Sequence, residues 1–181
     1  MLLSDTTLKK YLSSGEIKIL PEVNPKDIKS IGIRMHLGTD ILIPQNNQVI
    51  DLGKSDQPNY DPFTMESSGY ILKPHQFILG TTKERFQVRR DLVAFIDGRS
   101  TLARVGLSIH VTSQMADGNY DNASAITLEI QNVGPMDLIL RPDMAIGMLS
   151  FFTLTEPVSN EAEFLYKNQH TVLPPQMNGL N

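Results

Sequence analysis

Short apolar runs dominate the sequence after its first 15 residues, and Gly, Pro, Asn or Asp separates most runs from the next. Between residues 126 and 131, Ile, Leu and Ile alternate with Thr, Glu and Gln. Successive side chains of a β-strand point to opposite faces, so this alternation predicts strands with one buried face. The predicted strands are Ile17–Leu20, Ile41–Ile43, Tyr70–Leu72, Phe77–Gly80, Leu92–Ile96, Leu107–Val111, Ala125–Ile130, Leu138–Leu140 and Ala145–Phe152. Many short strands without long helices between them predict a mainly β fold, a distorted jelly-roll-like β-barrel.

One short helix is predicted at the N-terminus. Ser4 is a residue type that caps the first turn of a helix. Leu8, Tyr11 and Leu12 then follow at positions i, i+3 and i+4, which places them on one apolar stripe. Gly15 is expected to end the helix.

Two stretches lack a clear strand pattern. The segment Asp51–Ser68 is polar and contains Pro58 and Pro62, so we expect a loop that leaves the main fold. Residues 156–181 contain three more prolines and are expected to form a C-terminal arm or lid. With 181 residues, the chain is predicted to be a single domain over residues 1–181.

Composition narrows the classes of function. The formal net charge is −4, so the chain has no general basic field for nucleic acid. It has no cysteine, and its four histidines are scattered, so neither a thiolate zinc site nor another protein-bound metal site is expected. No signal peptide and no membrane-spanning apolar segment are evident, which leads us to expect a cytoplasmic protein without a membrane partner.

The run Asp97–Arg104 is a candidate anion site. It directly follows an apolar strand, and its residues from Ser100 onward can form one helical turn that ends near Gly106. Backbone N–H groups at such a strand-to-helix junction point outward, and Arg99 and Arg104 add guanidinium groups suited to phosphate. The alternative is an ordinary β-turn with two surface arginines.

Glu129 is the second candidate, because it interrupts an apolar strand. Alternation can simply point its side chain to solvent, which is the usual position of a strand glutamate. On the inner face it would need a partner such as Arg104, and it could then take a proton from water and deliver it later. Asp117 and Tyr120 lie on a third segment, where they can contact one sugar or form a plain Asp-Gly hairpin.

The central run extends to a longer signature. Residues 97–107 read Asp-Gly-Arg-Ser-Thr-Leu-Ala-Arg-Val-Gly-Leu, followed by His110-Val111-Thr112. Residues 127–130 read Thr-Leu-Glu-Ile, and residues 166–169 read Tyr-Lys-Asn-Gln. In this order, these segments resemble the bacterial and archaeal dCTP deaminases, which share a superfamily with the trimeric dUTPases.

The resemblance implies a fold and a reaction. The fold is a dUTPase-like β-clip that assembles as a homotrimer with its sites between subunits. The reaction is hydrolytic removal of the cytosine amino group of dCTP without zinc, which gives dUTP and ammonia. Glu129 would act as general base and acid, Ser100 would hold the water and the pyrimidine ring, and Arg104 would stabilise the developing charge.

The resemblance also implies how the nucleotide is bound. Arg99 would contact the phosphates, Asp117 would bind the 3′-hydroxyl, and Gln169 would close over a triphosphate that carries Mg²⁺. The further residues expected to contact the substrate are Thr101, Val111, Tyr120, Thr127, Leu128, Tyr166 and Lys167.

The sequence departs from this family pattern at several positions. The segment 117–124 retains the Asp and the aromatic residue, lacks the usual Pro-Gly and is about two residues longer. Met115 and Leu165 stand where the family often has a basic residue. Arg34 and His36 occupy the two charged positions of the usual Asp-x-Arg-Leu-Gly motif.

Three further functions therefore remain open beside deamination. The first is dUTP diphosphatase activity, alone or coupled to deamination, with dUMP as product. The second is a diverged deoxynucleotide-binding protein without catalysis. A purely structural jelly roll is the third, and it would not explain why Arg99, Ser100, Arg104 and Glu129 occur together.

Overall fold

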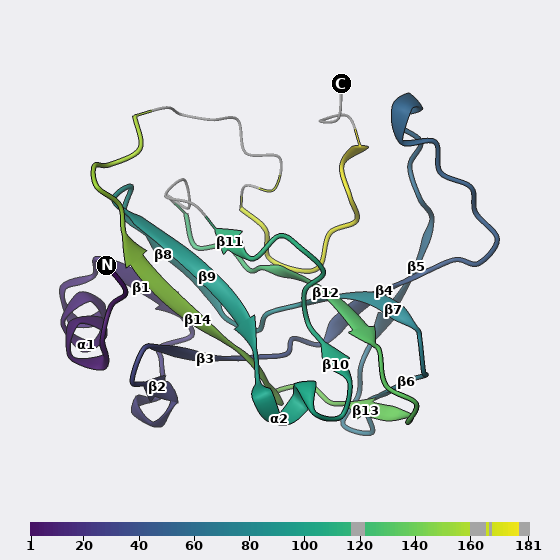
Figure 1. The fold of residues 1–181 in the computed structure, drawn as a ribbon, viewed down its shortest axis with the longest axis horizontal. Coiled ribbons are helices and arrows are strands. Elements are labelled where there is room, and N and C mark those ends of the chain that lie inside the picture. Colours follow the sequence, from purple (N-terminus) through teal and green to yellow (C-terminus); the bar gives the residue numbers. More distant parts are fainter. Residues whose placement is uncertain (117–121, 160–165, 167, 178–181) are drawn as a thin grey trace.

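The computed structural model describes residues 1–116, 122–159, 166 and 168–177, and it consists mainly of β-strands (Figure 1). The first five-stranded sheet has the order β10-β12-β7-β4-β5. Its strands are β10 (Leu107–Ser108), β12 (Thr127–Asn132), β7 (Phe77–Thr81), β4 (Asp40–Pro44) and β5 (Tyr60–Thr64). All of its pairings are antiparallel.

The second five-stranded sheet has the order β11-β9-β14-β3-β2 and is also antiparallel. Its strands are β11 (Met115–Ala116), β9 (Leu92–Gly98), β14 (Ala145–Thr153), β3 (Gly32–His36) and β2 (Ile28–Lys29). Two two-stranded sheets complete the strands: β1 (Ile17–Leu20) with β8 (Arg85–Val88), and β6 (Tyr70–Leu72) with β13 (Leu138–Leu140). The remaining elements are α1 (Asp5–Ser14), α2 (Ser100–Ala103), η1 (Pro25–Asp27) and η2 (Leu52–Lys54).

The two large sheets contribute to one apolar core. Leu128 and Ile130 of β12 belong to it, and so do Ala94 of β9, Leu149 of β14 and Met35 of β3. Each of these side chains is at least 97% buried. The mainly β, jelly-roll-like fold class is confirmed, and the strands of the described part of the chain pair in open sheets rather than in a closed barrel.

The predicted helix is confirmed as α1, with Leu8 fully buried beneath it. Gly15 adopts the left-handed conformation at φ 77° and returns its N–H to the carbonyl of Leu12, which ends the helix as expected. The side chain of Ser4 makes no capping hydrogen bond, and only its backbone carbonyl accepts from Leu8.

The prediction for Asp51–Ser68 was wrong in one part, because the segment contains β5. This strand pairs with β4 at the edge of the first sheet, and the hairpin carries residues 45–59 away from the fold (Figure 1). Pro62 lies within β5, where its missing N–H is tolerated because an edge strand pairs on one side only. We refer to residues 40–64, from β4 to β5, as the hairpin arm.

Within the C-terminal segment, residues 168–177 pack against the first sheet. Val172 and Met177 are buried, although they do not belong to the core between the two sheets. Val172 is 6% exposed and Met177 is 7% exposed. We refer to residues 168–177 as the tail, and its packing gives the first sheet a second covered face.

Candidate functional site

Glu129 lies on the outer face of β12. Leu128, Ile130 and Asn132 are buried on the inner face, so alternation points Thr127 and Glu129 to the opposite side. The Glu129 carboxylate accepts a hydrogen bond from the backbone N–H of Val111 at 3.1 Å. Glu129 is half-buried, so neither alternative from the sequence describes its position: it faces neither open solvent nor the apolar core.

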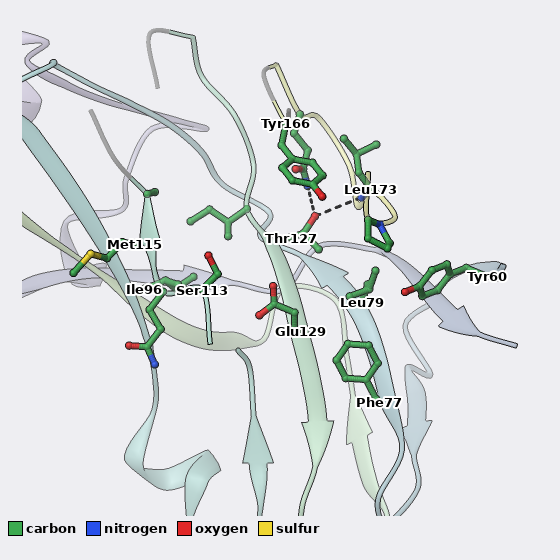
Figure 2. Close-up of a pocket in the computed structure, with 15 residues that line it drawn as sticks. Tyr60, Phe77, Leu79, Ile96, Ser113, Met115, Thr127, Glu129, Tyr166 and Leu173 are labelled. Atoms are coloured by element: carbon green, nitrogen blue, oxygen red, sulfur yellow. Dashed lines mark hydrogen bonds between the residues drawn. The ribbon is translucent and has the colours of Figure 1, made fainter. Parts of the chain in front are cut away.

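A cavity of about 420 Å³ surrounds this carboxylate. Phe77 and Leu79 of β7 form one wall, and Leu79 pairs directly with Glu129 across the strands (Figure 2). Ser113 and Gln114 contribute polar groups from the loop before β11. The cavity therefore combines one carboxylate, a few hydrogen-bonding groups and an apolar wall, a composition typical of small-molecule sites.

The tail covers the cavity next to Thr127. Gln169 is 4% exposed, and its amide donates to the Thr127 hydroxyl oxygen at 2.5 Å. The backbone N–H of Leu173 donates to the same oxygen at 3.4 Å (Figure 2). Tyr166 also lines the cavity, and its hydroxyl accepts from the backbone N–H of Gln176 at 3.0 Å.

Tyr60 reaches the cavity from the hairpin arm (Figure 2). Burial raises the pKa of its phenol, and the neighbouring Tyr166 raises this pKa further. Near neutral pH, Tyr60 is therefore an uncharged hydroxyl that can donate one hydrogen bond into the cavity.

The predicted anion run folds as expected but lies outside this cavity. Strand β9 leads directly into α2, and Gly106, at φ 87°, ends the turn. Ser100, Thr101 and Arg104 are all exposed. The Arg104 guanidinium donates to the Ser100 hydroxyl at 3.4 Å, and among the described residues it makes no ion pair with Glu129. Figure 1 shows α2 at the lower end of the molecule, below β12.

Arg99 is held more firmly than its neighbours. Its guanidinium donates to the backbone carbonyl of Ala145, at the start of β14, at 2.7 Å. A guanidinium has five N–H donors, so this contact fixes the side chain and leaves other donors for an anion. None of the four predicted residues in this run lines the Glu129 cavity.

The loop that holds Glu129 is braced by its own side chains. Val111 is exposed, and its contribution to the site is the backbone N–H that reaches Glu129. The amide of Gln114 contacts Nδ1 of His110 at 2.8 Å and Nε2 at 3.1 Å, and the Asp97 carboxylate lies 3.6 Å from Nε2. These contacts connect the end of β9 with the loop that carries the N–H donor.

The structure therefore separates the predicted site residues into groups. Thr127, Glu129, Tyr166 and Gln169 meet at the cavity, whereas the side chain of Leu128 is buried in the core and points away from it. The α2 group lies apart, as described above. The predictions for Asp117, Tyr120 and Lys167 fall outside the described residues, as does the departure at Leu165.

Several cavity residues were missed from the sequence. Tyr60 lay in a segment expected to be a loop. Leu173 and Pro175 lay in a segment whose apolar residues show neither helix nor strand periodicity. A signal did exist at Phe77–Leu79, where the apolar run is continuous instead of alternating. Such a run is typical of a strand that is covered on both faces.

The departure at residues 34–38 has a structural counterpart away from the cavity. The backbone N–H of His36 donates to one carboxylate oxygen of Glu84 at 2.8 Å, and its ring contacts the other at 2.6 Å. Arg34 lies 3.7 Å from the buried carboxylate of Asp27. Arg34 and His36 therefore have acidic partners and brace β3. Neither residue lines the Glu129 cavity.

Two findings concern metals and membranes. No group of three or more His, Asp or Glu side chains that could hold a metal ion occurs within residues 1–116, 122–159, 166 and 168–177. In the same described ranges, no helix is both long enough and apolar enough to cross a lipid bilayer.

Comparison with known proteins places the chain in a family. A family model described as dCTP deaminase-like matches residues 2–154. The chain therefore belongs to the dCTP deaminase-like family, which confirms the resemblance seen in the sequence.

Individual relatives are similar over most of their length. A protein named dCTP deaminase, dUMP-forming, from Methanobrevibacter smithii is 35% identical over 162 residues, which cover 86% of this chain and 82% of the relative. A protein named dCTP deaminase from Pseudoalteromonas translucida is 33% identical over 192 residues, which cover 96% of each chain.

Solved structures support the fold. The dCTP deaminase of Agrobacterium tumefaciens matches with a TM-score of 0.64 at 12% identity over 82% of this chain, and the match spans 47% of that longer chain. The native EIAV dUTPase matches with a TM-score of 0.50 at 16% identity, over 84% of this chain and 98% of that one. At such identities the likeness concerns the fold alone, and it supports the dUTPase-like architecture.

Proposed function

We propose that this protein is a dCTP deaminase that converts dCTP and water to dUTP and ammonia without zinc. The observation that carries the proposal is the half-buried Glu129 carboxylate, held by one backbone N–H within a cavity of nucleoside size. The names of the relatives support the same reaction. The proposed enzyme is a hydrolase that acts on the cytosine C4–N bond.

Glu129 is suited to both proton transfers of this reaction. It would remove a proton from water as the water oxygen bonds to C4, and it would then deliver that proton toward the amino group as the C4–N bond breaks. The N–H of Val111 donates to one carboxylate oxygen, which leaves the other oxygen to face the water. A well-placed general base of this kind contributes about 10²- to 10⁴-fold to a rate.

We propose that the remaining catalytic groups come from a neighbouring subunit of a homotrimer. Ser100 and Arg104 are exposed on α2 and do not line the Glu129 cavity of their own chain. If the sites lie between subunits, α2 of one subunit can supply the hydroxyl and the guanidinium to Glu129 of the next. Arg99 and Thr101 would reach the nucleotide from the same element.

The nucleotide would carry its own Mg²⁺ on the triphosphate. Thr127, Tyr166 and Gln169 line the cavity and would contact the substrate there, together with the backbone around Val111 and Leu128. Asp117, Tyr120 and Lys167 complete the proposed contacts, with Asp117 on the 3′-hydroxyl. We further propose that residues 1–181 act as one domain in the cytoplasm, with about 156–181 as its lid.

Ammonia release tests the proposal directly. Purified protein with dCTP and magnesium is expected to release ammonia and form one uracil nucleotide per ammonia. Well-folded protein that releases no ammonia over the range of dCTP concentrations at which it binds nucleotide would overturn the deaminase assignment.

A second candidate is deamination coupled to diphosphate release, with dUMP as the product. The relative from Methanobrevibacter smithii, whose name includes "dUMP-forming", favours it. Chromatography of the products separates the two candidates, since pyrophosphate appears only when the phosphate chain is cleaved. The same assay with dUTP as substrate reveals diphosphatase activity without deamination.

A further inference from the structure

The tail is attached at two positions, Gln169 and Leu173, to the start of β12 and the residues just before it. The carbonyl of Gln169 accepts from the backbone N–H of Ala125 at 2.8 Å, and its side chain donates to Thr127. The N–H of Leu173 returns to Thr127. Between these two attachments, the side chain of Thr171 contacts a different strand, β4.

Thr171 hydrogen-bonds to Asp40 of the hairpin arm. Its hydroxyl donates to one oxygen of the Asp40 carboxylate at 3.0 Å. The other oxygen accepts from the hydroxyl of Thr64, on the paired strand of the arm, at 2.8 Å. One carboxylate at the start of β4 therefore joins the arm to the tail, which lies 131 residues further along the chain.

The arm and the tail enclose the same side of the Glu129 cavity. Tyr60 lines it from the arm and Leu173 from the tail (Figure 2), and Pro175 of the tail lines it as well. Leu79 is 6% exposed even though it lies on the outer face of its sheet, and it lines the same cavity as these segments. The attachment at Asp40 therefore holds two parts of one enclosure together.

We infer that Asp40 is a positioning residue, which holds the tail over the Glu129 cavity of its own subunit before nucleotide binds. The inference rests on the proposed function for its effect on catalysis, since the tail carries Gln169 and encloses the proposed dCTP site. A tail that is already docked has less conformational entropy to lose when dCTP binds. Asp40 acts through the tail and need not touch the substrate.

The two threonines on Asp40 provide a matched pair of variants. Thr171→Val removes the hydroxyl that connects the tail and keeps the size of the side chain. Thr64→Val removes an equivalent hydroxyl that connects Asp40 only within the arm. Thr171→Ser keeps the tail hydroxyl while it removes the methyl group, and it serves as the conservative control.

Hydrogen exchange of the ligand-free, full-length protein measures tail docking without reference to any activity. In Thr171→Val, backbone amides of residues 168–177 are expected to exchange about tenfold faster than in the wild type, because a hydrogen bond to a charged group is lost. In Thr64→Val and Thr171→Ser, exchange of the tail is expected to remain within about twofold of the wild type. Equal exchange in all four proteins would overturn the inference.

Kinetics with dCTP then separate positioning from chemistry. For Thr171→Val we expect KM to rise about three- to tenfold with kcat within about twofold, because docking lowers the cost of binding and leaves the reacting groups in place. A fall in kcat with unchanged KM would contradict a positioning role for Asp40. If the wild type releases no ammonia, the exchange experiment still decides whether Asp40 docks the tail, so the two proposals can fail separately.

Discussion

The candidate site residues lie in two regions of this molecule, the α2 run and the Glu129 cavity, and these regions differ in how they are built. The run from Arg99 to Arg104 is continuous in sequence, sits on one strand-to-helix turn and is mostly exposed. The Glu129 cavity is assembled from β7, β12, the hairpin arm and the tail, which are far apart in sequence. The α2 run is thus one continuous motif on an exposed surface. The enclosed site instead combines the short motifs at residues 127–130 and 166–169 with residues of β7 and the arm that belong to no motif.

Removing the Glu129 carboxylate tests the cavity side of this comparison and has the largest expected effect. Glu129→Gln should lower the rate of ammonia release about 10³-fold or more, because the amide cannot accept a proton from water. Its amide oxygen can still accept the N–H of Val111, so the thermal unfolding midpoint should change little. Glu66→Gln, at an exposed position outside the cavity, is the matched control and should retain full activity. Deamination by Glu129→Gln at more than a tenth of the wild-type rate would remove Glu129 from the mechanism.

Mixing two inactive variants tests whether the two regions meet across a subunit boundary. Arg104→Ala should lower activity about 10²-fold, because a cation that stabilises developing charge is lost. When Arg104→Ala and Glu129→Gln are unfolded and refolded together in equal amounts, about a quarter of the wild-type activity should return. This fraction is the chance that an intact Glu129 faces an intact Arg104 of another subunit. If mixing restores nothing while each variant still forms trimers, the two residues act within one chain or not at all.

The sequence predicted these two regions unequally well, and the reason is physical. The turn at α2 depends on local features, a strand followed by small polar residues and Gly106, so it could be predicted from a few neighbours. The contact between Thr171 and Asp40 depends on long-range packing that no local pattern encodes. Tyr60 was missed for the same reason, because Pro62 made its strand look like a loop and only pairing with β4 makes it an edge strand.

Gly106 tests how rigidly the α2 region is presented. Its φ of 87° is strained for any other residue, and an added Cβ would lie 2.5 Å from the backbone nitrogen of Gly134. Gly106→Ala should therefore lower the free energy of unfolding by about 2–3 kcal/mol, from left-handed strain and the backbone clash together. Gly98→Ala is the control at the other end of the run, since its nearest neighbour would lie 3.8 Å away at Ile109. Urea denaturation measures the free energy of unfolding of both variants. An equal loss in Gly106→Ala and Gly98→Ala would show that the backbone at Gly106 is no more constrained than at Gly98.

Tyr60 tests the enclosure on the arm side and has the smallest expected effect. Its pKa is raised by burial and by Tyr166, so the folded state favours the neutral phenol. The associated stability is complete below the ordinary tyrosine pKa of about 10 and is lost as the pH rises through the higher folded pKa. Absorbance near 295 nm, a wavelength at which tyrosinate absorbs, should therefore show one late-titrating tyrosine in the wild type that is missing in Tyr60→Phe.

The same variant links this titration to the tail. Because Tyr60 and Tyr166 lie against one cavity, a tail released by Thr171→Val should leave Tyr60 more hydrated and bring its titration back toward the ordinary range. Thr64→Val, which leaves the tail attached, should not change the titration. A late-titrating tyrosine that persists unchanged in Thr171→Val would mean that the arm encloses Tyr60 without the tail. The enclosure of the Glu129 cavity on this side would then depend on the arm alone.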